Sequence, residues 1–98
     1  MHFDLEFSGE ACIQLHKLEK NKALQVPLKA VRKTLGLMQV NLRHPSLQTH
    51  KCHSISGPVG GDVLESYAQN LTPGAYGVFW CYGPDKGVIT VLAIVSHP

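Results

Sequence analysis

Five polar residues between positions 43 and 97 have side chains suited to acid–base and phosphate chemistry: Arg43, His50, Lys51, Glu65 and His97. An imidazole or a carboxylate can take or give a proton, and lysine and arginine cations can hold a phosphate. These residues are widely spaced, and polar residues of these types lie more often on the surface than in a catalytic site. A shared function therefore depends on whether the fold brings them together.

A zinc site is the alternative for the group formed by His44, His50, Cys52 and His53. Neither the C-x-x-C nor the H-x-x-x-H spacing of structural zinc sites is present. On a strand, His50 and Cys52 would share one face while His53 points to the other. We therefore expect no metal ion and no cofactor.

Other motifs exclude further classes of enzyme. The glycine-rich segment 57–61 lies between two predicted strands, whereas a phosphate-binding loop joins a strand to a helix. No G-x-S-x-G sequence is present, so nothing indicates an acyl-transfer hydrolase. Three cysteines at unrelated spacings favour reduced thiols, and with them a cytoplasmic location.

The net charge of +2 conceals a strong asymmetry. Between Lys17 and His53 the chain holds eight lysines and arginines against the single acid Glu19. The rest of the chain holds Lys86 against six acids. Such segregation favours a polyanionic partner or an acidic protein partner. For Lys29, Arg32 and Lys33, which lie on the outer face of a helix, a solvated surface is the favoured interpretation.

The elements that must position the polar residues follow from apolar periodicity and turn residues. We expect an α+β fold in a single domain over residues 1–98. The predicted elements are a strand over 2–7, helices over Gly9–Lys20 and from about Val26 to Asn41, and strands over Leu47–Ile55, Asp62–Gln69, Ala75–Tyr82 and Val88–Val95. The last two strands form a hairpin around Pro84 and Gly87.

The packing of these elements is set by one apolar stripe on the second helix, formed by Leu24, Leu28, Val31, Leu35 and Met38. A short connection between the helices makes them antiparallel neighbours. The expected order is therefore β-α-α-β-β-β-β, a mostly antiparallel sheet with both N-terminal helices packed on one face.

This order, together with several short motifs, resembles the RelE/ParE toxin superfamily. The motifs are Asn41-x-x-His44-Pro45-x-Leu47-x-x-His50-Lys51, Ala75-Tyr76-x-Val78-Phe79-Trp80 and Ile89-x-Val91-Leu92-x-Ile94-x-x-His97. The resemblance implies a small cytoplasmic toxin that a cognate antitoxin protein neutralises. RelE-like members cleave mRNA on the ribosome, whereas ParE-like members act on DNA gyrase and are not nucleases.

The resemblance also implies roles for the five polar residues. In metal-independent cleavage of mRNA, Glu65 or His50 would take the proton of a 2′-hydroxyl and His97 would protonate the leaving oxygen. Lys51 and Arg43 would hold the phosphates of the RNA. The alternative is a non-catalytic binding protein, either a gyrase-directed toxin or a degenerate toxin that only binds its antitoxin.

Gly77 is the departure from the family pattern that favours the alternative. RelE-like nucleases typically carry an arginine directly after the tyrosine of this strand, where it would stabilise charge on the scissile phosphate. Glycine cannot do so. From the sequence alone, a Gly77→Arg substitution is expected to strengthen cleavage.

Overall fold

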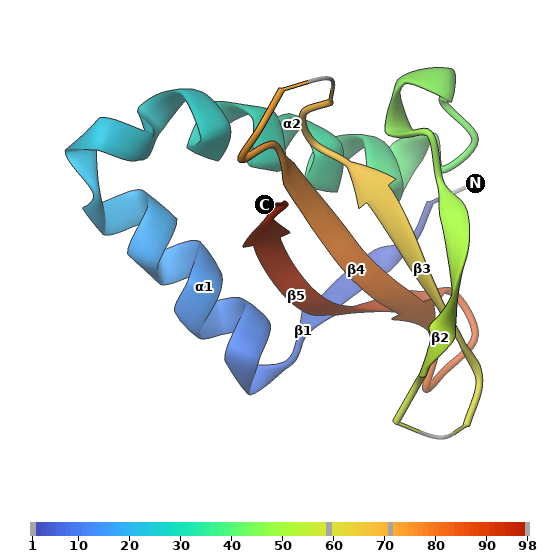
Figure 1. Cartoon of the computed structure of the whole chain (residues 1–98). Coiled ribbons are helices and arrows are strands. Elements are labelled where there is room, and N and C mark those ends of the chain that lie inside the picture. The colour runs from blue at the N-terminus through green and yellow to red at the C-terminus, as the bar shows by residue number, and fades with distance from the viewer. Residues whose placement is uncertain (1, 59, 71, 98) are drawn as a thin grey trace.

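The computed structural model describes residues 2–58, 60–70 and 72–97 and has the predicted α+β architecture (Figure 1). The strands are β1 (Asp4–Phe7), β2 (His50–Ser56), β3 (Asp62–Tyr67), β4 (Tyr76–Tyr82) and β5 (Val88–Ser96). The helices are α1 (Gly9–Lys20) and α2 (Gln25–Val40), with short 3-10 turns at Lys22–Leu24 and Pro45–Leu47. None of the helices in these described ranges is long and apolar enough to cross a membrane.

The five strands form one sheet in the order β1-β5-β4-β3-β2. Neighbouring strands from β2 to β5 pair antiparallel, whereas β1 lies parallel to β5. Figure 1 shows α1 beside β5 and β1 and α2 crossing behind the sheet. The buried residues of both helices belong to one core with the sheet, so the predicted placement of the helices on one face is confirmed.

The core follows from the alternation of side chains along the central strands, which a register shift between Phe79 and Trp80 interrupts once. Val78, Trp80 and Ile94 point to the helices and are buried, together with the helix residues Ala11, Leu18, Leu28, Val31, Leu35 and Met38. The Trp80 indole donates a hydrogen bond from Nε1 to Ser66 Oγ at 2.9 Å. This hydrogen bond joins β4 to β3 inside the core and so contributes to the register between the two strands. Neither of the two buried polar groups is left without a partner.

The N-terminus of α1 is tied to the sheet by Ser8. Its Oγ accepts a hydrogen bond from the Ala11 N–H at 3.1 Å and donates one to the Leu92 carbonyl of β5 at 2.9 Å. The first is the helix cap that the sequence predicts. The second joins the helix to the strand that carries His97 at its end.

Replacing Ser8 by alanine is expected to lower the free energy of unfolding by about 1–2 kcal/mol, since both hydrogen bonds are lost. Urea unfolding followed by circular dichroism measures the change. Ser54→Ala, at an exposed position of β2, is the matched control and should change stability by less than about 0.5 kcal/mol. Equal effects from the two substitutions would contradict the role of Ser8.

Several predicted strand boundaries differ from the structure, and those of β2 and β3 lie nearest the site. Strand β2 begins at His50 and not at Leu47, because Pro45 starts a 3-10 turn in which His44 Nδ1 accepts from the Ser46 N–H at 3.1 Å. Leu47 closes this turn and is buried in the core. Strand β3 ends at Tyr67, two residues before the predicted end at Gln69. The shorter β2 places His50 at the very start of its strand.

Candidate active site on the open face of the sheet

The face of the sheet that the helices leave uncovered gathers three of the five predicted site residues. His50 on β2 lies directly opposite Glu65 on β3, and Glu65 in turn lies opposite Phe79 on β4. His97 follows the last residue of β5 and lies two residues beyond Val95, whose register partner is Gly77. Glu65 and His97, which are 32 positions apart, therefore meet because antiparallel neighbours place side chains in register on one face.

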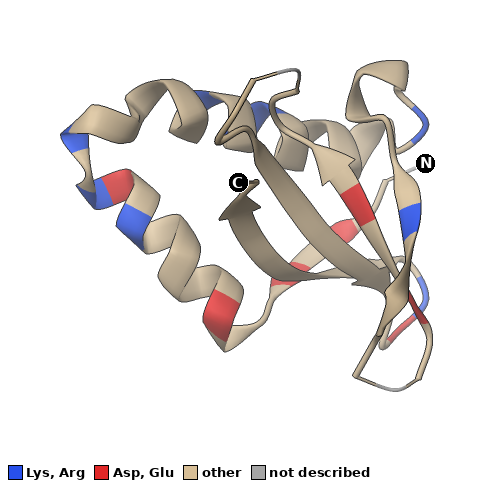
Figure 2. Ribbon diagram, in the orientation of Figure 1, with Lys and Arg blue, Asp and Glu red and all other residues tan. Residues whose placement is uncertain are grey.

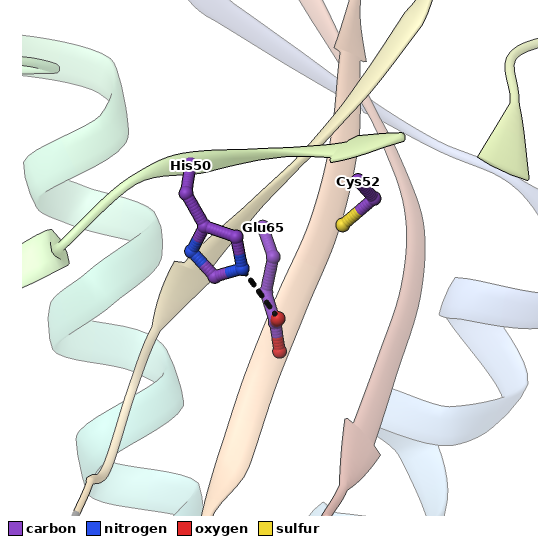
Figure 3. A group of neighbouring side chains, drawn as sticks. All are labelled: His50, Cys52 and Glu65. Atoms are coloured by element: carbon purple, nitrogen blue, oxygen red, sulfur yellow. Dashed lines mark ion pairs between the residues drawn. The ribbon is translucent and has the colours of Figure 1, made fainter. Parts of the chain in front are cut away.

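Glu65 is the centre of this group. It is only 4% exposed, and both of its carboxylate oxygens contact a histidine. Oε1 lies 3.3 Å from His50 Nε2, and Oε2 makes a short hydrogen bond with His97 Nε2. Figure 3 shows the His50 ring turned toward the carboxylate from the neighbouring strand. A buried carboxylate requires such partners, since burying it without them is costly.

The other ring nitrogen of His50, Nδ1, indicates which atom of the ring carries a hydrogen. Nδ1 lies 3.2 Å from the Gln48 carbonyl oxygen, which can only accept, so Nδ1 carries a hydrogen. A neutral His50 then has a bare Nε2 facing another acceptor, Glu65 Oε1. A hydrogen on either of these two atoms, or a bound cation, would join them.

His97 is held by its backbone and by two aromatic rings. Its N–H donates to the Ala75 carbonyl at 2.8 Å, and its carbonyl accepts from the Gly74 N–H at 2.9 Å. Tyr67 and Phe79 lie beside the ring, with centroids 6.2 and 6.4 Å away. Because Glu65 engages Nε2, the other nitrogen, Nδ1, is the one left to act on a substrate while the carboxylate orients the ring.

Comparison with solved structures shows the same fold in two other proteins. RelE in an archaeal RelE–RelB complex from Pyrococcus horikoshii OT3 superimposes with a TM-score of 0.64 at 12% identity, over 98% of this chain and 96% of that one. The fold is that of RelE. YoeB, from a dimer of the Staphylococcus aureus protein, gives a TM-score of 0.63 at 13% identity over the whole of both chains.

The predicted resemblance to the RelE/ParE superfamily is thus confirmed at the level of the RelE fold. The sequence itself matches no protein-family model. It also matches no curated protein. At 12–13% identity the similarity concerns the course of the backbone, and the chemistry of the site has to be argued from this chain's own residues.

Gly77 leaves the space that the carboxylate of Glu65 occupies. A Cβ atom at position 77 would overlap Glu65 Oε2 and lie 3.2 Å from His97 Nε2. Glycine therefore makes room for the Glu65–His97 pair on the neighbouring strands. The family arginine and this pair cannot share the site without rearrangement, which reverses the expectation that Gly77→Arg strengthens cleavage.

The two predicted phosphate-binding residues do not join the site. Lys51 follows His50 on β2, so its side chain points to the opposite face, where Nζ pairs with Asp62 at 3.2 Å. Arg43 lies in the loop after α2 and lines a pocket with Val40, Gln48 and Tyr82. Figure 2 shows positive charge along the helices and at the β2 edge, while β4 and β5 carry no charged residue.

Two further residues belong to this face: Tyr67, which the sequence did not indicate, and Cys52, which the sequence placed only in the rejected zinc site. Tyr67 contacts the edge of the His50 ring at a centroid distance of 5.4 Å as well as that of His97, so it frames both imidazoles. Cys52 is half-buried, and burial and, to a lesser degree, the Glu65 carboxylate raise the pKa of its thiol. The shared face of His50 and Cys52 was visible in the alternation of β2, but the position of Glu65 opposite them was not.

Proposed function

We propose that this protein is a toxin of the RelE type that cleaves mRNA on the ribosome by acid–base chemistry without a metal ion. The observation that supports this best is the pair of half-exposed imidazoles, His50 and His97, on either side of the buried Glu65 carboxylate. Two histidines on one open surface can serve as the base and the acid of a phosphodiester cleavage. The RelE fold agrees with this assignment.

The proposed reaction uses only groups of the RNA and of these side chains. His50 Nε2 takes the proton of a 2′-hydroxyl, and the oxygen attacks the adjacent phosphorus. The bond from phosphorus to the 5′ oxygen breaks, and His97 gives its Nδ1 proton to that oxygen. The products are a 2′,3′-cyclic phosphate and a 5′-hydroxyl end. Glu65 is too buried to reach RNA, so it acts by positioning the two rings.

Expression of the protein without a partner tests this proposal. Growth should stop, and mRNA from the arrested cells should carry new 5′-hydroxyl ends within translated regions. The end groups are measured by sequencing RNA ligated through its 5′-hydroxyl. Growth arrest with intact mRNA would contradict the nuclease and favour a gyrase-directed toxin if a resistant gyrase relieved it.

The second candidate function is that of a binding protein without catalysis. The placement of Arg43 and Lys51 favours it, because neither of these two cations lies with the two histidines to neutralise a phosphate. The P. horikoshii RelE forms a complex with RelB, and by analogy we propose that this chain binds an antitoxin protein. Three apolar side chains on the helices, Ile13, Val26 and Val40, are exposed, and each offers such a partner an apolar contact.

The basic residues distinguish RNA contact from protein contact. Changing Arg43 to alanine is expected to lower ribosome affinity and to reduce the slope of log K against log salt by about one, for the one lost phosphate contact. The matched control is Lys33→Ala on α2, which should leave that slope unchanged and weaken antitoxin binding. Lys51 and Arg32 are left out because they pair at 3.2 Å with Asp62 and Glu19. Equal effects of the two substitutions on the slope would indicate a diffuse solvated surface.

A further inference from the structure

His50, Cys52 and Glu65 form a group of possible metal ligands that the proposed reaction does not need. His50 Nε2, Cys52 Sγ and a Glu65 carboxylate oxygen all lie within 4.8 Å of one another. In Figure 3 the ring of His50 and the sulfur of Cys52 both turn toward the carboxylate from the adjacent strand. The three side chains therefore converge on one point beside β2.

The spacing fits a small divalent ion with nitrogen, sulfur and oxygen ligands. Zinc holds such ligands at about 2.0–2.3 Å in a tetrahedron, which places neighbouring ligand atoms roughly 3.3–3.8 Å apart. His50 Nε2 and Glu65 Oε1 are already 3.3 Å apart. The sulfur lies within 4.8 Å of the other two ligand atoms, so bringing it into the same range needs a side-chain movement of at most about 1.5 Å.

The surrounding hydrogen bonds are those that prepare ligands for a metal. The Gln48 carbonyl accepts from His50 Nδ1–H at 3.2 Å, which leaves the Nε2 lone pair free and aimed at the group. His97 contacts the second carboxylate oxygen of Glu65, so Oε1 remains for an ion. A ligating histidine bonded to a backbone carbonyl and a ligating carboxylate bonded by a neighbour are regular features around bound metals.

The lone pair of His50 Nε2 and the negative charge of the Glu65 carboxylate also favour a bound cation. When Nδ1 of His50 carries the hydrogen, Nε2 presents a lone pair to Oε1 of the Glu65 carboxylate at 3.3 Å, and the sulfur of Cys52 lies within 4.8 Å of both. A divalent ion would satisfy both acceptors at once and convert the thiol to a bound thiolate. The mixture of imidazole, thiolate and a single carboxylate selects zinc-like transition metals over magnesium or calcium.

We infer that His50, Cys52 and Glu65 form a binding site for a zinc-like divalent transition metal, with a fourth position open to solvent. The sequence argued against zinc because ligands were sought along one segment, His44 to His53. The third ligand comes instead from the neighbouring strand, opposite His50. Occupancy would withdraw His50 Nε2 from proton transfer and inhibit cleavage. That consequence alone rests on the proposed function, whereas metal binding does not.

Titration of the tag-free, reduced protein with Co²⁺ tests the site in the absence of RNA. A near-ultraviolet thiolate-to-cobalt band should appear and be abolished by added Zn²⁺. The band should be missing in Cys52→Ser and retained in Cys12→Ser, whose cysteine lies exposed on α1. His50→Ala and Glu65→Gln should each weaken Zn²⁺ binding by more than about 100-fold, the upper end of the loss caused by outer partners.

Melting curves with and without Zn²⁺ give a second readout for variants that fold. Zinc should raise the melting temperature of the unsubstituted protein and of Cys12→Ser but not that of Cys52→Ser. A cobalt band that persists in Cys52→Ser, visible bands without a thiolate band, or equal melting shifts with and without Cys52 would each overturn the site. The gap between His50 and Glu65 would then be bridged by a proton. Loss of RNA cleavage with normal metal binding would count only against the nuclease.

Discussion

Replacing His97 by alanine is expected to reduce mRNA cleavage by about 10²- to 10⁴-fold, the usual contribution of a positioned acid or base. The substitution removes the proton donor for the leaving 5′ oxygen and leaves the RNA-binding surface in place. The rate is measured in single turnover on ribosomes programmed with a defined mRNA. Growth arrest in cells should be relieved in parallel.

A matched histidine on another surface separates this effect from a general one. His16 lies on α1 with its side chain 65% exposed and 3.9 Å from Glu19, so His16→Ala should cleave at the rate of the unsubstituted protein. His97→Ala also leaves Glu65 with one partner fewer, and urea unfolding is needed to show that the variant is folded. A folded His97→Ala that cleaves as fast as His16→Ala would exclude His97 from the reaction.

The second large effect is expected at Gly77, where even alanine should damage the site. The new Cβ would meet Glu65 Oε2 and press on His97 Nε2, so the carboxylate must move away from at least one ring. We expect Gly77→Ala to lower the free energy of unfolding by about 1–3 kcal/mol, as overpacking does elsewhere. Gly77→Arg should do the same and should slow cleavage, because the acid then loses its positioning residue.

Gly36 provides the control for a glycine-to-alanine change. It lies within α2, and a Cβ there would have nothing within 4 Å. Gly36→Ala should therefore be neutral or stabilising by up to about 1 kcal/mol, since alanine favours helix. Faster cleavage by Gly77→Arg than by the unsubstituted protein would show that the family arginine improves the site and that the Glu65–His97 pair is dispensable.

Much of the fold was predictable because its core is built from regular patterns. The stripe from Leu28 to Met38 predicted the buried face of α2, and each of its members at positions 28, 31, 35 and 38 is in the core. Ser8 predicted the start of α1 from capping chemistry alone. These features depend on neighbours within a few residues, which is what periodicity and capping rules describe.

The site was harder to predict because it depends on register between strands. Lys51 was expected to join His50, but adjacent residues on a strand point to opposite faces, and the pairing of His50 with Glu65 fixes which face is which. From the sequence, Gly77 could be recognised only as a position where RelE-like nucleases typically carry an arginine. Its role in admitting the Glu65 carboxylate becomes visible once β3 and β4 are in register.

The most direct measurement of the central claim uses an mRNA with a single 2′-deoxy nucleotide at the position that the protein cleaves on the ribosome. In the proposed reaction the 2′-oxygen of that nucleotide is the nucleophile, so this one change should abolish cleavage at that bond while ribosome binding persists. The all-ribose control should yield a 2′,3′-cyclic phosphate. Cleavage of the deoxy mRNA at the control rate, or an intact all-ribose control, would contradict the account.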